Sequence, residues 1–218
     1  MYNFEYVSPQ KYKPVKKELI KLINLVQDEV REYFTFDFRF IGSSSRNMIT
    51  CDKTSNIGYD FDVNLIINDE NNEFTAKEIK KILMNAFNKH KDKFKYNKIE
   101  DSKRVITIKV VDHKNSKILH SCDFAVVNYY IDDDGNEWQE FIFHNKKQNS
   151  YEWQEQKESF YLLPDKINWL KKMGLWQNVR NYYLEKKNKN TNPNKKSRSL
   201  YAEAVNDIYH NNCELNQE

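Results

Sequence analysis

The pattern of hydrophobic and polar residues divides the chain into a first part with alternating helical and strand patterns and a second part that is mainly helical. Near the start, apolar residues recur at helical spacing and predict a helix over about 14–33. Residues 36–41 then alternate phenylalanine with charged residues, which indicates a half-buried strand that ends in a turn at Gly42-Ser43. A second strand is expected over 59–67.

The later elements follow from turn and capping signals. Thr75 and Glu78 form a capping box, which predicts the start of a helix. Three further strands are expected over 104–111, 119–130 and 137–143, with a turn at 132–136 between the last two. From about residue 151 the pattern favours helices: one long helix over 164–185, an exposed basic linker over 186–198, and a last helix capped by Ser199.

This order of elements predicts the α+β class, with a mixed sheet flanked by helices. We expect a catalytic core with its N-terminal helix over 1–148 and a C-terminal helical region over 149–218. A chain of 218 residues can bury a core without disulfides. The cysteines, Cys51, Cys122 and Cys213, are widely spaced and odd in number, which favours free thiols in a reducing cytoplasm.

Charge and hydropathy narrow the class of protein further. The chain has 35 basic and 32 acidic residues, a near-balance that argues against a dedicated nucleic-acid binder. It has no run of 18 apolar residues, so no membrane span is expected. The abundance of Asn and Lys favours an origin in an AT-rich bacterial genome or mobile element.

Two carboxylates lie on the expected strand over 59–67. Side chains alternate faces along a strand, so Asp60 and Asp62 point the same way, about 7 Å apart along the strand. Phe61 and Val63 point the other way, into a core. Two like charges this close repel each other unless a cation neutralises them. Hard oxygen ligands of this kind suit Mg²⁺ or Mn²⁺.

A third carboxylate, Asp123, lies in the most apolar strand of the chain, where an unpaired aspartate is unusual. A metal shared with Asp60 and Asp62 would explain it, because three carboxylates can hold two metal ions about 4 Å apart for phosphoryl displacement. The turn at Gly42-Ser43 supplies a second part of such a site. Glycine permits a close backbone approach, and the amides that follow it can hold phosphate oxygens together with the Ser43 hydroxyl.

A strand ending in Gly42-Ser43, a strand with Asp60 and Asp62, and a later strand with Asp123 resemble the polymerase-beta-like nucleotidyltransferase superfamily. The helix before the Gly-Ser strand and the helical C-terminal part look most like the CD-NTase-like branch of oligoadenylate synthetases and cyclic-dinucleotide synthases. The resemblance covers about residues 36–130 and implies that Gly42 and Ser43 grip a nucleoside triphosphate such as ATP.

The resemblance also implies that the three aspartates bind two Mg²⁺ and that Asp123 helps to activate an acceptor hydroxyl. The chain departs from the common pattern at Arg46, which no Gly-Thr step follows, and in its long segment between Ser43 and Asp60. The acceptor stays open between a second nucleotide, an RNA end, a protein side chain and a small-molecule antibiotic.

Other interpretations accompany this one. The same fold without activity would serve as a nucleotide or RNA sensor or as a protein-interaction module, and a metal-dependent nuclease would also use an acidic cluster. His120 and Cys122 share a strand face opposite Asp123, and packing explains them better than zinc does. The basic run over 186–198 fits a solvated linker better than a phosphate or RNA contact.

Overall fold

The structure is a computed structural model that describes residues 2–55, 58–69, 72–157, 159–192 and 195–213. The described chain falls into two compact units. The larger unit comprises Tyr6–Cys51 and Asn56–Gln156, and the smaller comprises Met1–Glu5, Asp52–Ser55 and Lys157–Glu218. No helix among the described residues combines the length and the apolar character that a bilayer crossing requires.

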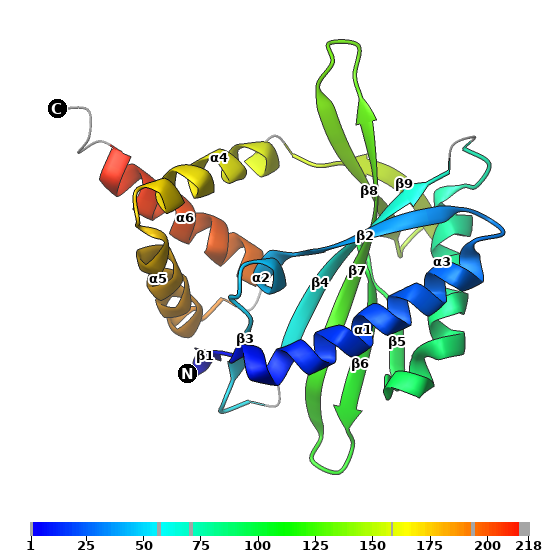
Figure 1. Cartoon of the computed structure of the whole chain (residues 1–218), viewed down its shortest axis with the longest axis horizontal. Helices are drawn as coiled ribbons and strands as arrows, with labels where there is room; N and C mark the ends of the chain where they lie inside the picture. Colours follow the sequence, from blue (N-terminus) through cyan, green and yellow to red (C-terminus); the bar gives the residue numbers. More distant parts are fainter. Residues whose placement is uncertain (1, 56–57, 70–71, 158, 193–194, 214–218) are drawn as a thin grey trace. The chain divides into compact units, whose positions relative to one another are not determined.

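The larger unit is built on a seven-stranded mixed sheet (Figure 1). Its strands are β2 (Thr35–Ile41), β4 (Tyr59–Asn68), β5 (Lys98–Asp101), β6 (Ile106–Asp112), β7 (Lys117–Ile131), β8 (Glu137–Asn145) and β9 (Ser150–Glu155). Five of them run in the order β2-β4-β7-β6-β5, and β8 joins β7 to β9. The β4–β7 pair is parallel and the other pairs are antiparallel. The mixed α+β fold expected from the sequence is therefore confirmed.

The long strand β7 organises this sheet. One edge of β7 pairs with β4, and the other edge pairs first with β6 and then with β8. Because β4 and β7 are parallel neighbours, Asp62 lies directly opposite Asp123 in the register. The two expected strands that carry carboxylates are thus adjacent at the centre of the sheet.

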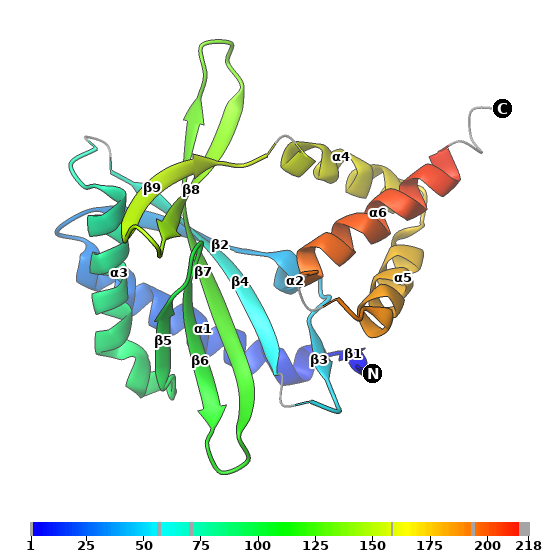
Figure 2. The same ribbon diagram turned by 180° about the vertical axis from the view of Figure 1, so that it is seen from behind.

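Helices α1 (Pro9–Val30) and α3 (Ala76–His90) cover one face of the sheet (Figures 1 and 2). The apolar side chains of β4 fill the space beneath them; Phe61, Val63 and Leu65 are fully buried. The short 3₁₀ helix η1 (Lys91–Phe94) follows α3. The opposite face of the central strands carries the carboxylates of Asp60, Asp62 and Asp123.

The predicted start of α3 is confirmed. Thr75 Oγ1 accepts a hydrogen bond from the Glu78 amide at 3.3 Å, and Glu78 Oε2 accepts one from the Thr75 amide at 2.8 Å. Each bond satisfies an amide that would otherwise lack an intrahelical partner.

The first helix begins earlier than predicted, at Pro9 instead of Pro14. Pro9 takes the position in the first turn where a missing N–H has no cost, and Pro14 lies inside the helix. The side chain of Tyr12 is only 3% exposed, and its hydroxyl donates to Asn47 Oδ1 at 2.6 Å. Burial of Tyr12 extends the apolar face of the helix toward its N-terminus.

The long segment between Ser43 and Asp60 contains structure of its own. Helix α2 (Gly42–Ser45) is a single turn, and β3 (Thr50–Asp52) pairs with β1 (Phe4–Tyr6) in a separate two-stranded sheet. Met48 and Ile49 between them are almost fully buried. Residues 56 and 57 lie outside the described residues.

The helical region begins later than the sequence predicts. Residues 150–155 form β9 rather than helix, because the Tyr151 side chain packs into the sheet. The ring of Tyr151 stacks on His144 at 4.1 Å between centroids, and its hydroxyl donates to Asp101 Oδ2 at 2.6 Å.

The smaller unit contains helices α4 (Ser159–Lys172), α5 (Trp176–Lys189) and α6 (Ser197–Cys213). The single helix predicted over 164–185 is wrong, because Gly174 adopts a left-handed conformation with φ of +72° and separates α4 from α5.

The predicted linker over 186–198 is also shorter in the structure. Helix α5 continues to Lys189, since Lys186 Nζ pairs with Asp207 at 2.8 Å on α6. Helix α6 begins at Ser197 and not after Ser199. Residues 193 and 194 of the predicted linker lie outside the described residues.

Candidate active site

The structure brings Asp60, Asp62 and Asp123 together, as the alternation of side chains along the strands predicts. Asp60 and Asp62 come from β4, and Asp123 comes from the parallel neighbour β7. One carboxylate oxygen from each lies within 4.8 Å of the others. All three side chains are partly buried. The three carboxylates, called the triad below, form one cluster on the sheet face opposite α1 and α3.

The triad concentrates negative charge in a place with little water. Burial, followed by the charges of Asp123 and Asp62, raises the pKa of Asp60 from 3.8 to about 8. Burial also raises the pKa of Asp123, against a hydrogen bond from Thr107 that lowers it. A divalent cation would relieve this repulsion, and the donor set of carboxylate oxygens is the kind that Mg²⁺ and Mn²⁺ prefer. The residues present therefore fit a hard divalent metal.

Two hydroxyl groups contact the triad from the same sheet. Ser121 Oγ donates to Asp60 Oδ1 at 2.8 Å, and Thr107 Oγ1 donates to Asp123 Oδ1 at 2.6 Å. Neither residue is identified as a site residue by the sequence pattern alone. A signal exists, because Thr107 is a polar residue between the buried Ile106 and Ile108, but only the register shows which carboxylate it faces.

Gly42 lies directly against the triad. Ile41, the residue before it, pairs with Asp62 in the β2–β4 register. Gly42 has a φ of +62°, and a β-carbon at this position would lie 2.3 Å from Asp62 Oδ2. Both the backbone conformation and the neighbouring carboxylate therefore require glycine here.

Ser43 differs from the two serines that follow it in α2. Ser44 Oγ donates to the Ile41 carbonyl at 2.8 Å, and Ser45 Oγ donates to the Gly42 carbonyl at 3.0 Å. The Ser43 hydroxyl has no hydrogen-bond partner within the described part of the chain. The first amides of a helix also lack intrahelical partners. The Ser43 side chain is thus available to a ligand beside the triad.

His120 and Cys122 lie on the other side of β7 from Asp123, as expected. The His120 ring stacks on Tyr59 with centroids 5.7 Å apart and meets Tyr96 edge-on at 5.6 Å. Cys122 is fully buried. Both side chains are packed groups, as the sequence pattern favours.

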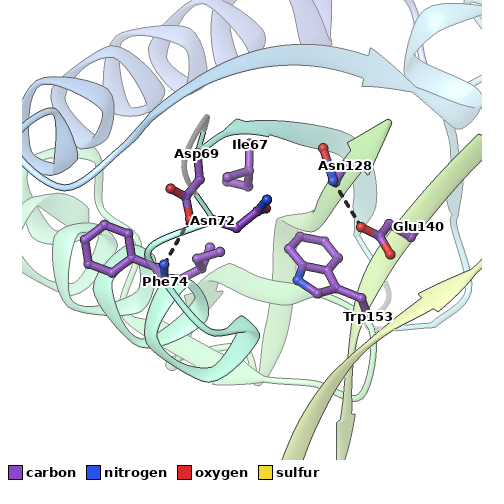
Figure 3. Close-up of a pocket in the computed structure, with 8 residues that line it drawn as sticks. Ile67, Asp69, Asn72, Phe74, Asn128, Glu140 and Trp153 are labelled. Atoms are coloured by element: carbon purple, nitrogen blue, oxygen red, sulfur yellow. Dashed lines mark hydrogen bonds between the residues drawn. The ribbon is translucent and has the colours of Figure 1, made fainter. Parts of the chain in front are cut away.

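A separate pocket lies near the far end of β4 (Figure 3). Ile67, which lines it, is five residues beyond Asp62 and on the opposite, helix-covered face. Two of its polar side chains are engaged within the protein: Asn128 Nδ2 donates to Glu140 at 3.0 Å, and Asp69 accepts from the Phe74 amide at 3.0 Å. The pocket contains no member of the triad and is distinct from the candidate active site.

Neither protein-family models nor curated proteins match this sequence. Solved structures of cyclic-dinucleotide synthases do match the fold. The STING-associated c-di-GMP synthase CdnE from Capnocytophaga granulosa has a TM-score of 0.59 and 17% identity over 94% of this chain and 64% of its own. The GTP-bound DncV from Vibrio cholerae has a TM-score of 0.56 and 16% identity over 92% and 52% of the two chains.

The CD-NTase CdnG from Bradyrhizobium diazoefficiens, solved with GTP, has a TM-score of 0.52 and 13% identity over 74% of this chain. The present chain spans 42% of that protein and about half to two thirds of the other two. At these identities the likeness concerns the fold alone. The chain has the nucleotidyltransferase fold of the CD-NTases, as the resemblance of its motifs implies.

Proposed function

We propose that this chain is a metal-dependent nucleotidyltransferase that transfers a nucleoside monophosphate from a nucleoside triphosphate to an acceptor hydroxyl and releases pyrophosphate. The observation that carries the proposal is the convergence of the triad beside Gly42, within a fold shared with CD-NTases that were solved with GTP or ATP. Each part has a separate task in the reaction, and the parts adjoin one another.

In this proposal, Gly42 and Ser43 hold the triphosphate through backbone amides and the free Ser43 hydroxyl. Asp60 and Asp62 would hold two metal ions, and Asp123 would complete one of the two metal sites. When bound there, Mg²⁺ or Mn²⁺ stabilises the charge on the attacking and leaving oxygens. Asp123 favours loss of the acceptor proton.

The reaction balances as an in-line displacement. The acceptor oxygen forms a bond to the α-phosphorus, and the bond from that phosphorus to the bridging oxygen breaks. The electron pair leaves on pyrophosphate, and the acceptor proton passes to the Asp123 carboxylate, which acts as the base. Holding both reactants in line on one rigid sheet removes much of the entropic part of the barrier.

The test is pyrophosphate release from each labelled nucleoside triphosphate in Mg²⁺ or Mn²⁺, with separation of the products. The acceptors tried are a second nucleotide, RNA, protein and small-molecule alcohols. We expect the parent to release pyrophosphate. Asp123→Asn should lower the rate of release by several orders of magnitude, because the variant loses a ligand of one metal site and the carboxylate that favours loss of the acceptor proton. Pyrophosphate release at the parental rate in Asp123→Asn would contradict the proposal. Nucleotide binding without release would indicate the inactive sensor instead.

A further inference from the structure

The triad is held by hydrogen bonds from two neighbouring strands. Thr107 on β6 lies opposite Asp123 in the register, and Ser121 on β7 lies opposite Asp60. In both cases the hydroxyl donates to Oδ1 of the facing carboxylate, at 2.6 and 2.8 Å. The same arrangement therefore occurs twice, on different strand pairs.

The Thr107 hydroxyl is held in its hydrogen bond to Asp123 by the burial of the residue. Its side chain is 6% exposed, and a buried hydroxyl needs a hydrogen-bond partner. The flanking residues Ile106 and Ile108 are fully buried, which fixes the strand and hence the direction of the Thr107 side chain. The bond to Asp123 thus ties this carboxylate to a rigid part of the sheet.

A carboxylate that accepts such a bond on one oxygen cannot rotate freely. Groups that orient a metal ligand in this way commonly change metal affinity by ten- to a hundredfold. We propose that Thr107 and Ser121 are positioning residues, which turn the second oxygen of Asp123 and of Asp60 toward the bound metals. The inference rests on the proposed function.

The two residues differ in the effect expected of them. Thr107 acts on Asp123, which belongs to one metal site in the proposed function, whereas Ser121 acts on Asp60, which is shared by both sites. Removing the Thr107 hydroxyl should therefore weaken one metal and spare the other. Removing the Ser121 hydroxyl should weaken both.

The experiment titrates Mn²⁺ into the full chain by calorimetry and electron paramagnetic resonance, with a non-hydrolysable α,β-methylene analogue of ATP or GTP present. Thr107→Val removes the hydroxyl and keeps the branched shape, and Thr107→Ser restores the hydroxyl. Ser121→Ala tests the second contact independently. Thr54→Val is the matched control, because Thr54 Oγ1 makes a similar bond to Asp52 Oδ1 at 3.0 Å outside the triad.

We expect two Mn²⁺ ions in the parent, one of them bound about ten- to a hundredfold more weakly in Thr107→Val, and near-parental binding in Thr107→Ser and Thr54→Val. Parental binding of both ions in Thr107→Val and Ser121→Ala would overturn the inference and leave the proposed function standing. Equal losses in Thr107→Val and Thr107→Ser would also overturn the role of Thr107. A parent that binds no Mn²⁺ with nucleotide would overturn the proposed function together with the inference.

Discussion

Gly42 and Asp62 occupy adjoining space, so that a β-carbon on residue 42 would lie 2.3 Å from Asp62 Oδ2. The contact arises because β2 ends beside β4, with Ile41 opposite Asp62. The glycine of the Gly-Ser turn thus has a second reason to be glycine besides the approach of phosphate. It leaves room for a carboxylate of the triad.

The first prediction concerns Gly42→Ala. The new methyl group must displace the Asp62 carboxylate, so Mn²⁺ and nucleotide binding should both be lost. A residue in the left-handed region also costs about 1–2 kcal/mol of stability. Gly135→Ala is the control, because Gly135 has a φ of +84° with nothing within 4 Å of a β-carbon. Calorimetry should show that Gly135→Ala loses about as much free energy of unfolding as Gly42→Ala does. Its Mn²⁺ binding should equal that of the parent. Parental Mn²⁺ binding in Gly42→Ala would contradict the prediction.

The second prediction concerns the pH dependence of stability without metal. Burial and the other two carboxylates hold the pKa of Asp60 at about 8, against 3.8 for an ordinary aspartate. Between these pH values the folded protein binds a proton that the unfolded chain has released. Stability from this group is therefore full below about pH 4 and declines as the pH rises toward 8.

Asp60→Asn removes this titration. In the presence of a metal chelator, the melting temperature of Asp60→Asn should exceed that of the parent at pH 8. The difference between the two melting temperatures should decrease toward pH 4. Addition of Mg²⁺ at pH 8 should raise the melting temperature of the parent more than that of the variant. Thermal melts across this range check the result, and an equal pH dependence in both proteins would contradict the raised pKa of Asp60.

The third prediction concerns a buried ion pair beneath α3. Lys80 Nζ lies 2.7 Å from Asp101 Oδ1 and donates to the Ser102 carbonyl at 2.8 Å, and the Lys80 side chain is 1% exposed. Lys80→Met removes the buried ammonium group from Asp101, which keeps its contacts with Tyr151 and His144, and should lower the free energy of unfolding by about 3 kcal/mol. Lys81→Met, at the exposed next residue, should change it by no more than about 0.5 kcal/mol. Urea unfolding of both variants gives the comparison.

The sequence shows the triad but not the groups that hold it. Alternation of apolar and polar residues from Tyr59 to Leu65 is enough to place Asp60 and Asp62 on one face, and an aspartate in an apolar strand marks Asp123. The pairing of Thr107 with Asp123 depends on which strands are neighbours and in what register. That information is non-local, since it comes from the packing of the whole sheet.

The predicted boundaries of helices and strands are wrong where tertiary contacts outweigh local sequence signals. Pro14 looks like a helix start, yet burial of Tyr12 extends α1 one turn earlier. Tyr151 reads as the start of a helical region, yet its contacts with His144 and Asp101 hold it in β9. The segment over 164–185 has the pattern of one helix, yet the left-handed conformation of Gly174 separates it into two.

The last prediction separates the serines of α2. Ser43→Ala should lower the rate of nucleotidyl transfer roughly ten- to a hundredfold, because a hydrogen bond to a charged group contributes about 1.5–3 kcal/mol and the amides of the same turn still hold the phosphate. Ser45→Ala is the matched control, since the Ser45 hydroxyl is already bonded to the Gly42 carbonyl. It should leave the rate nearly unchanged.

Rates of pyrophosphate release at saturating Mg²⁺ compare the two variants with the parent. The Ser43 effect should appear in kcat/KM and mainly through KM, because the hydroxyl contacts the phosphate in both the bound and the reacting states. Mn²⁺ binding without nucleotide should be the same in all three proteins, because neither hydroxyl contacts the triad. An equal loss of rate in Ser45→Ala would show that the turn acts through its backbone conformation, and the role proposed for the Ser43 hydroxyl would be wrong.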